Sequence, residues 1–150
     1  MTHTSALSKN GQHLVAFLPI RPIYANRILS GDKQFEFRRA PINEALTHIV
    51  IYASTPTKKI VGLAEVAEVG ASSPTAAWES AKHAAGISRK DFRKYFEAKK
   101  RAYTIKLRNV IQFDRPVNLD EVSRGFKVPQ SFRYVQPEFV KTLLRASTRP

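Results

Sequence analysis

Apolar runs and alternating stretches divide much of the chain into predicted strands. His13–Ile20 (HLVAFLPI) and Leu46–Ser54 (LTHIVIYAS) are apolar runs of strand length, which indicates strands buried on both faces. Lys59–Val69 (KIVGLAEVAEV) follows a short turn and predicts the second half of a hairpin, with a bend at Gly62. In Tyr103–Phe113 apolar side chains alternate with basic or polar ones. The pattern therefore predicts a sheet of mostly long, bent strands.

Helical spacing of apolar residues fills the segments between these strands. The first predicted helix precedes Gly31, which stands where a left-handed C-cap belongs. The second begins at the Ser73 N-cap and ends at Gly86, and Trp78 is expected to anchor it to the sheet. A terminal helix is predicted to begin at Pro137. The alternative for the tryptophan is a platform on which a nucleobase stacks.

A third helix is predicted after Ser88, which together with Asp91 resembles a capping box. Phe92, Tyr95 and Phe96 form its buried stripe, and its other faces are basic. This density of cations, together with the basic face of the strand that follows, predicts a surface that contacts phosphates. The residues assigned to phosphate binding are Arg89, Arg93, Lys94, Lys100, Arg101, Lys106 and Arg108.

The overall charge points the same way. The chain has 25 Lys and Arg against 12 Asp and Glu, a formal charge of +13 and a pI near 10.3. Such an excess favours a polyanionic partner, most simply nucleic acid. The alternative is a protein-binding regulator whose charge serves solubility only.

Composition also narrows the chemistry and the compartment. The absence of cysteine excludes disulfides, thiolate catalysis and cysteine-ligated zinc. None of His3, His13, His48 and His83 has the spacing of a metal ligand pair, and no glycine-rich phosphate loop is present, so no metal or cofactor is expected. The sequence has neither an apolar run near 18 residues nor a signal peptide, which predicts a cytoplasmic protein without a membrane segment.

Length and element order predict one domain. At 150 residues the chain can bury a single core, with residues 1–11 as a disordered tail and 12–150 as the domain that includes the terminal helix. Four or five strands with helices between them, but without strict β-α-β alternation, indicate the α+β class. The expected architecture is a small mixed β-barrel with helices packed around it.

Three charged side chains gather where the first helix turns into a strand. Phe35 and Phe37 point one way and are expected to enter a core, whereas Glu36 and Arg38 point the other way. Lys33 stands at the start of this strand. A surface ion network and a polar binding site both fit this spacing.

The stretch Ile28–Arg38 (ILSGDKQFEFR) resembles the entry motif of ASCH domains in the PUA-like superfamily, in which a helix ending in S-G-x-K leads into a strand x-x-E-x-R. Later blocks resemble the same family in the same order, namely Ile51–Pro56, Lys59–Val66, Tyr95–Leu107 and Pro129–Val135. The resemblance spans Leu14 to Val135. It implies a small PUA-like β-barrel with a cleft between barrel and helices, used for RNA or modified nucleotides.

A nucleobase cleft is the resulting hypothesis. Tyrosine would stack against a base, while glutamate and glutamine would read its edge. Arg38 would hold Glu36 ionised and oriented. The stretch Phe126–Val135 mixes proline, polar and aromatic residues without a clear period, which indicates a functional loop. The residues expected to line the cleft are Lys33, Glu36, Arg38, Tyr52, Ser54, Gln130, Ser131 and Tyr134.

Hydrolysis is the alternative function. Some ASCH proteins are similar to hydrolases of N4-acetylcytidine, and others show ribonuclease activity. In the amidohydrolases the lysine that matches Lys33 is thought to activate a threonine, whose position here is Glu36. A further catalytic glutamate would fall near Ala84 and Ala85, where no carboxylate stands. An enzyme of this kind would therefore have to use Lys33 and Glu36 as electrostatic partner and general base.

Overall fold

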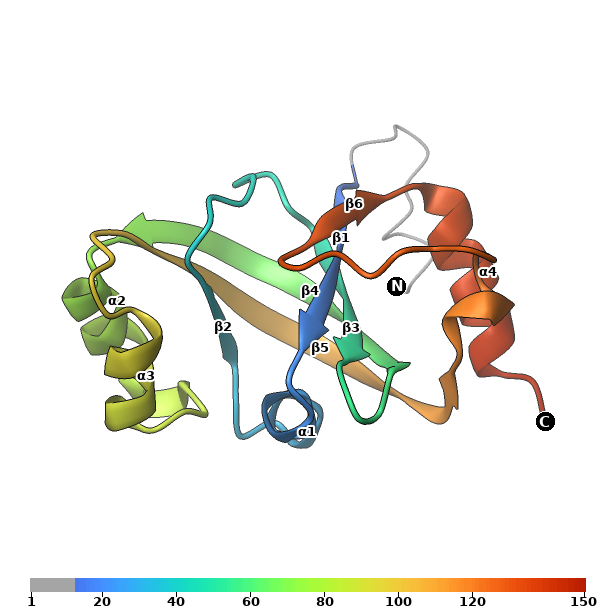
Figure 1. The fold of residues 1–150 in the computed structure, drawn as a ribbon, viewed down its shortest axis with the longest axis horizontal. Coiled ribbons are helices and arrows are strands. Elements are labelled where there is room, and N and C mark those ends of the chain that lie inside the picture. Colours follow the sequence, from blue (N-terminus) through green and yellow to red (C-terminus); the bar gives the residue numbers. More distant parts are fainter. Residues whose placement is uncertain (1–12) are drawn as a thin grey trace.

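The computed structural model describes residues 13–150, which form one six-stranded sheet with helices at its ends and on its faces (Figure 1). The strand order is β2-β5-β4-β3-β1-β6. The strands are β1 (Val15–Ile20), β2 (Phe35–Arg38), β3 (His48–Ala53), β4 (Lys59–Ser72), β5 (Ala102–Val117) and β6 (Arg133–Val135). The predicted tail at residues 1–11, which includes His3, lies outside the described residues.

Within residues 13–150, four α-helices and two short 3-10 helices connect or flank these strands. The α-helices are α1 (Pro22–Ser30), α2 (Pro74–Ala81), α3 (Arg89–Tyr95) and α4 (Pro137–Ser147), and the 3-10 helices are η2 (Lys82–Ala84) and η3 (Leu119–Glu121). In residues 13–150 no helix is long and apolar enough to cross a membrane. The mixed α+β class predicted from the sequence is confirmed.

The two longest strands, β4 and β5, lie next to each other in the sheet. β4 and β5 pair antiparallel and change register at several points, the first of them between Ile60 and Gly62. A Cβ on Gly62 would collide with the Ile111 carbonyl oxygen and come within 2.9 Å of the Leu29 Cδ2. The bend predicted at Gly62 is therefore confirmed, and glycine is required there because the neighbouring strand and helix leave no room for a side chain.

The sheet does not close into a barrel, so the predicted architecture is wrong on this point. β2 and β6 are its two edges within the described part of the chain, and β2 has only four residues. The Arg38 side chain of β2 instead reaches β1, where its Nη2 donates to the Pro19 carbonyl oxygen at 2.9 Å. A side chain thus spans the gap that backbone hydrogen bonds would close in a barrel. The part of the chain that the structure describes has six strands rather than the four or five expected.

Several predicted helix ends are confirmed by their caps. Gly31 has the left-handed φ of 92° expected of a C-cap. The Ser73 and Ser88 side chains accept hydrogen bonds from the backbone N–H groups of Ala76 and Asp91. Each of these interactions is local in sequence, which is why the sequence sufficed to predict it.

Two predicted helices are shorter than expected. α2 ends at Ala81, and the 3-10 turn η2 rather than α-helix leads to Gly86. α3 ends at Tyr95, and Ala98 takes a left-handed φ of 61° that no continuing helix allows. The basic residues Lys99, Lys100 and Arg101 therefore lie on the connection to β5 rather than on the helix.

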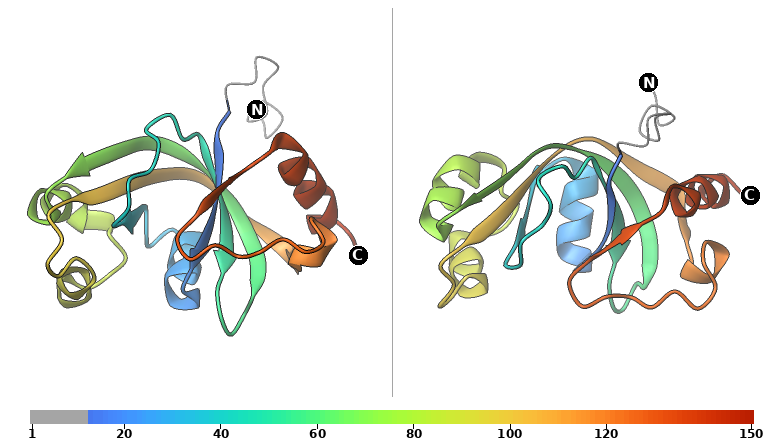
Figure 2. Two further views of the ribbon diagram at one scale, coloured as in Figure 1. Left: turned by 45° about the horizontal axis from the view of Figure 1, so that its top comes forward. Right: turned by 90° about the horizontal axis from the view of Figure 1, so that it is seen from above.

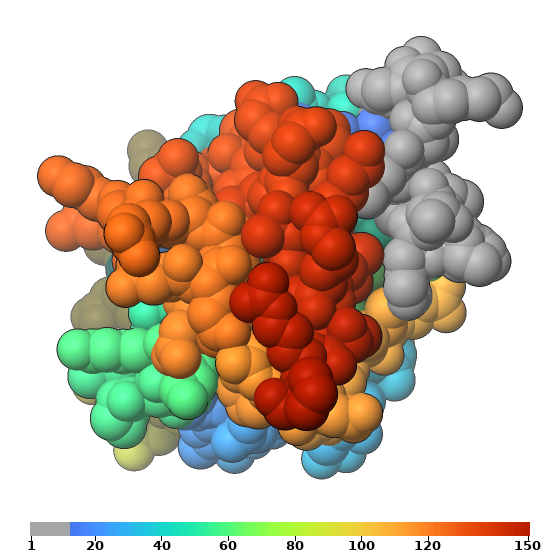
Figure 3. Space-filling view, turned by 90° about the vertical axis from the view of Figure 1, so that its right-hand side faces the viewer, coloured from blue at the N-terminus to red at the C-terminus, as the bar shows by residue number. Residues whose placement is uncertain are grey.

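Three apolar clusters hold the elements together. The first packs α1 against one face of the sheet, and the second packs α4 against the other face. The third joins α2 and α3 to Phe35 and Phe37 of β2, as the alternation in that strand predicted. The helices α2 and α3 lie at the opposite end of the molecule from α4 (Figure 2). Figure 3 shows that α4 and the segment before it cover the other end.

Candidate functional site

A pocket of about 560 Å³ opens between β2, the start of α1 and helix α3. Its volume falls in the range of roughly 300–1,000 Å³ that small-molecule sites occupy. Lys33, Glu36 and Arg38 all line it, so these three charged residues do come together in one hollow. The other lining residues are Pro19, Ile20, Arg21, Ile23, Tyr24, Phe37, Ile87, Asp91, Lys94 and Tyr95.

Lys33 is almost completely buried, with 3% of its surface exposed. Its Nζ donates a hydrogen bond to the Ala85 carbonyl oxygen at 2.8 Å. The same nitrogen lies 4.8 Å from the centre of the Phe37 ring and 5.4 Å from that of Tyr24. One backbone acceptor and two aromatic faces therefore fix the direction of the amine.

This environment lowers the pKa of Lys33 below its ordinary value of 10.5, chiefly because burial disfavours the charged amine. The nearby Glu36 carboxylate acts in the opposite direction, and the Arg27 and Arg38 guanidinium groups add to the lowering. A lysine with a lowered pKa reaches its neutral form, which can act as a base, at a lower pH than an exposed lysine.

Glu36 and Arg38 form a buried ion pair rather than a surface one. Arg38 Nη2 lies 2.9 Å from Glu36 Oε2, and each side chain is 9% exposed. The guanidinium also donates to the carbonyl oxygens of Ser131, at 3.1 Å, and of Pro19, at 2.9 Å. Its Nε is buried and has no hydrogen-bond partner within the described residues. The arrangement holds the Glu36 carboxylate in one orientation at the pocket wall.

Gly86 packs directly against Lys33. It has a φ of 65°, and a Cβ there would overlap the Lys33 side chain and lie 2.8 Å from its Cα. The Gly86 carbonyl accepts a hydrogen bond from Arg27 Nη1 at 2.9 Å. The sequence indicated Gly86 only as a helix end, because its contact with Lys33 joins segments that are far apart along the chain.

The remaining predicted cleft residues do not line this pocket. Tyr52 is 5% exposed and packs beside Phe17 in the α4 cluster, whereas its neighbours Ile51 and Ala53 belong to the α1 cluster. Because side chains alternate along a strand, Tyr52 faces the other side of the sheet from that α1 cluster. The expectation that it would stack in the same cleft as Lys33 is corrected accordingly.

The predicted cleft residues that lie in loops, or in β6 beside one, are also outside the pocket lining. Ser131 contributes its backbone carbonyl to Arg38, while Gln130 is exposed. The Tyr134 side chain is exposed, and its hydroxyl accepts a hydrogen bond from the Asn43 N–H at 3.1 Å. Ser54 lies in the turn after β3, where its N–H donates to the Ile20 carbonyl. The tertiary structure joins this loop to the pocket through Arg38.

The aromatic walls of the pocket come instead from Tyr24 on α1 and Tyr95 on α3. Arg39 lies over the Tyr95 ring at 4.6 Å. Burial raises the pKa of the Tyr95 hydroxyl, so it remains a neutral hydrogen-bond donor. The sequence placed Tyr95 in a buried helical stripe. The sequence did hold one indication that Tyr95 could line a pocket: it is the only polar ring in that stripe, and its hydroxyl needs a hydrogen-bond partner.

All the residues assigned to phosphate binding have exposed side chains. Arg89 and Arg93 line a second hollow, between α2 and α3, and Lys94 lines the pocket described above. Lys100, Arg101 and Lys106 are exposed. Arg108 is paired with Glu65 at 3.2 Å, with 61% of its side chain exposed. Their contact with phosphate remains a prediction.

Residues 13–150 contain no group of three or more His, Asp or Glu side chains that could hold a metal ion. His48 is 7% exposed, and its Nδ1 forms a hydrogen bond with Thr47 Oγ1 at 2.9 Å. Its ring also packs near that of His13, with 5.6 Å between centroids. These contacts give His48 a structural setting in the fold.

Comparison with known proteins finds a family, a curated relative and a solved structure that match most of this chain. Residues 14–135 match the family DUF365, described as a domain of unknown function. An ASCH domain-containing ribonuclease of Zymomonas mobilis is 31% identical over 138 residues, which cover 89% of this chain and 93% of that protein. The crystal structure of ASCH from Zymomonas mobilis superimposes with a TM-score of 0.78 at 31% identity, over 87% of this chain and 94% of the other.

A more distant match concerns the fold alone. The N-terminal domain of Staphylothermus marinus McrB aligns with a TM-score of 0.57 over 89% of this chain and 93% of that domain, at 13% identity. The open, bent sheet with its flanking helices therefore recurs in a protein of very different sequence.

Proposed function

The chain belongs to the DUF365 family and to the ASCH domain family of the PUA-like superfamily, and on this premise we propose that it is an RNA-binding protein with a nucleobase pocket. The base, unmodified or modified, occupies the hollow lined by Lys33, Glu36 and Arg38. The observation that carries the proposal is the placement of a buried amine and a buried, oriented carboxylate on the wall of an open pocket.

The chemistry of this wall matches the edge of a base. Each base edge presents hydrogen-bond donors and acceptors side by side, and unpaired bases are read on these edges by proteins that bind single-stranded RNA. Glu36 can accept from an exocyclic amino or ring N–H group, while Lys33 can donate to a ring nitrogen or carbonyl. Tyr24 and Tyr95 supply aromatic surface beside them, and stacking on such rings is worth about 1–3 kcal/mol per base.

Affinity for the rest of the strand is assigned to the exposed cations. Lys100, Arg101 and Lys106 are exposed and stand in a chain with a formal charge of +13. Cations of this kind bind phosphates without regard to sequence, and their binding weakens as salt rises. Base preference and salt dependence should therefore depend on different residues.

A binding experiment separates the two contributions. We expect Lys33→Ala to reduce the preference among short RNA oligomers of different base composition while leaving the slope of log affinity against log salt nearly unchanged. The double variant Lys100→Glu with Arg101→Glu should keep the base preference and reduce that slope by about 0.7 for each phosphate that the protein no longer neutralises. Fluorescence anisotropy over a salt series measures both quantities.

A control at a distant site is Lys141→Glu on α4, at the opposite end of the molecule from α3. It changes the net charge in the same direction and should alter neither quantity beyond a small shift. Wild-type protein that binds no RNA at moderate salt would contradict the proposal and favour a charge that serves solubility. A Lys33→Ala variant with unchanged base preference would remove the pocket from recognition.

Ribonuclease activity is a second candidate, favoured by the name of the Zymomonas mobilis relative and by the lowered pKa of Lys33. The neutral amine can take the proton of a ribose 2′-hydroxyl, whose oxygen then attacks the adjacent phosphorus as the 5′-oxygen leaves with a proton from a second group. Purified protein incubated with RNA would then release shorter products. Glu36→Gln and Lys33→Met should each lose turnover while RNA is still bound.

Deacetylation of N4-acetylcytidine is tested in the same assay by supplying that nucleoside. The chain has Glu36 where the amidohydrolases have a threonine nucleophile, and a carboxylate cannot take that role in the same way. We therefore expect no release of acetate. Release of acetate by the wild type, lost in Glu36→Gln, would contradict this expectation.

A further inference from the structure

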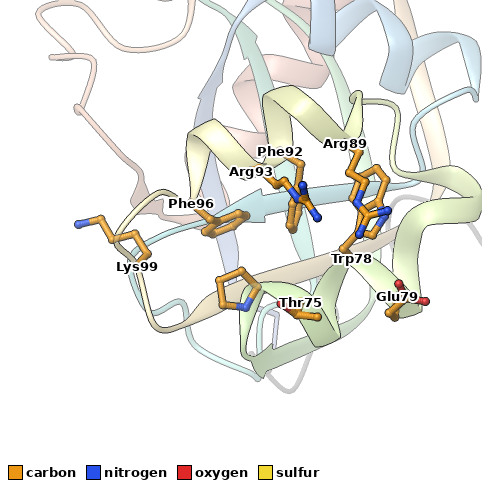
Figure 4. Close-up of a pocket in the computed structure, with 9 residues that line it drawn as sticks. Thr75, Trp78, Glu79, Arg89, Phe92, Arg93, Phe96 and Lys99 are labelled. Carbon is orange, nitrogen blue, oxygen red and sulfur yellow. The ribbon is translucent and has the colours of Figure 1, made fainter.

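A second hollow lies on the other side of helix α3, between α3 and α2 (Figure 4). Its volume is about 280 Å³. Asp91, Lys94 and Tyr95 of α3 line the Lys33 pocket, whereas Arg89, Phe92 and Arg93 of the same helix line this groove. Helix α3 thus separates two hollows, one on each side of it.

The floor of the groove is aromatic. Figure 4 shows Trp78, Phe92 and Phe96 in a row between the two helices. The Trp78 and Phe92 rings are 5.0 Å apart and the Phe92 and Phe96 rings 4.8 Å apart, measured between centroids. Both phenylalanines are buried, while Trp78 is only half-buried and leaves part of its indole uncovered. The partly exposed Trp78 therefore offers aromatic surface in the groove, next to the buried Phe92 ring.

The rim of the groove is cationic. Arg89, Arg93 and Lys99 line it, all three are exposed, and none of them makes a salt bridge within residues 13–150. Glu79 is the acidic member of the lining, and it is already paired with Lys82 at 2.8 Å. An anionic ligand with an aromatic part satisfies both features, which an apolar peptide does not.

We propose that this groove binds a second nucleotide of the same single-stranded RNA, with its base on Trp78 and its phosphates on Arg89 and Arg93. The inference rests on the proposed function, because it extends the strand whose first base occupies the Lys33 pocket. An α-helix with its side chains is about 10–12 Å thick, so a strand that crosses α3 needs only a few nucleotides to reach both hollows. Lys94, which follows Arg93 in α3, lines the Lys33 pocket.

Tryptophan fluorescence tests the proposal directly, because Trp78 is the only tryptophan in the chain. A single-stranded RNA oligomer of about eight nucleotides should quench or shift its emission as binding saturates, with the same midpoint as anisotropy. A mononucleotide should affect the emission far less, since it can fill the Lys33 pocket alone. Polyglutamate of matched charge carries no bases, and an equal change in emission with it would overturn the stacking role.

The variants are chosen outside the core. Arg89→Glu with Arg93→Glu should weaken binding of the octamer by about tenfold or more at low salt, reduce the salt slope by about 1.4, and abolish the emission change. Lys127→Glu with Lys141→Glu carries the same change in net charge on exposed residues away from the groove, and should retain the emission change.

The outcomes separate this inference from the proposed function. If RNA binds with base preference but leaves the Trp78 emission unchanged, or if the Arg89 and Arg93 double variant binds as the wild type does, the groove is not part of the interface and only this inference fails. If no RNA binds, both fail. A matching DNA single strand that gives the same emission change supports stacking in the groove without contact to the ribose hydroxyl, whereas a response to duplex alone overturns the proposal.

Discussion

The molecule carries two groups of charged residues whose environments differ sharply. Lys33, Glu36 and Arg38 are buried, at 3%, 7% and 7% exposure. Lys33 and Arg38 donate to backbone carbonyls, and Glu36 is paired with Arg38. Arg89 and Arg93 are exposed and make no salt bridge among the described residues. Both groups lie on hollows beside α3, so their difference is one of burial rather than of position.

Burial determines what each group can contribute. Removing a charge from water costs several kcal/mol unless partners compensate for it, so buried charges persist in a single arrangement with those partners. Such an arrangement can discriminate between ligands of different hydrogen-bonding pattern. Exposed cations cost little, adapt to any phosphate and are screened by salt. The buried group therefore suits recognition, and the exposed group suits affinity.

Removing Arg38 should have the largest effect on stability. Arg38→Ala leaves the Glu36 carboxylate buried without its partner and removes the donor to Pro19 and Ser131. Breaking a buried pair from one side typically costs about 3–5 kcal/mol, which we expect as the loss in free energy of unfolding measured by urea denaturation.

The control is Arg108→Ala, because the Arg108–Glu65 pair is exposed. It should cost no more than about 1 kcal/mol. Equal losses in the two variants would mean that burial does not distinguish the two kinds of ion pair in this protein.

Substitution of Gly86 should have the next largest effect. Gly86→Ala forces a side chain into a left-handed conformation and into the space of Lys33. Overpacking of this kind costs about 1–3 kcal/mol beyond the backbone strain, and it should displace Lys33 so that base preference weakens. Denaturation and RNA binding measure the two consequences.

Gly125→Ala is the matched control. Gly125 also has a positive φ, of 80°, but a Cβ there would meet open space. This variant should show the strain of about 1–2 kcal/mol alone, with base preference unchanged. If both variants behave alike, Gly86 does not position Lys33.

The pH dependence of Lys33 should be the smallest effect. Its pKa is lowered in the folded protein by burial, so between that pKa and about 10.5 the unfolded chain binds one more proton than the native state. The free energy of unfolding therefore increases as pH rises from the native pKa of Lys33 toward 10.5, and this contribution is lost as pH falls back to the native pKa. Relative to Lys33→Met, the wild type should become more stable as pH rises toward 10.5.

Urea denaturation of both proteins at several pH values checks the sign of this difference, and an NMR titration of the Lys33 side chain gives its pKa directly. A stability difference between wild type and Lys33→Met that falls with rising pH would contradict the burial argument.

The sequence by itself determined the features that depend on near neighbours. The left-handed C-cap at Gly31, the serine caps of α2 and α3 and the inward direction of Phe35 and Phe37 each follow from residues a few positions apart. The excess of positive charge is likewise independent of fold. The family motif around Lys33 added the expectation of a polar pocket, whereas the spacing alone favoured a surface ion network.

Only the tertiary structure decided which distant segments meet. Tyr52 was assigned to the cleft from its strand, but the phase of β3 turns it toward α4. Tyr95 forms an aromatic wall of the pocket because α3 packs across β2. Gly86 contacts Lys33 because the segment after the η2 turn passes next to that side chain. The sheet stays open, and Arg38 bridges β2 to β1 with a side chain. These outcomes depend on long-range packing, which selects one of two faces for every strand residue and which no local pattern encodes.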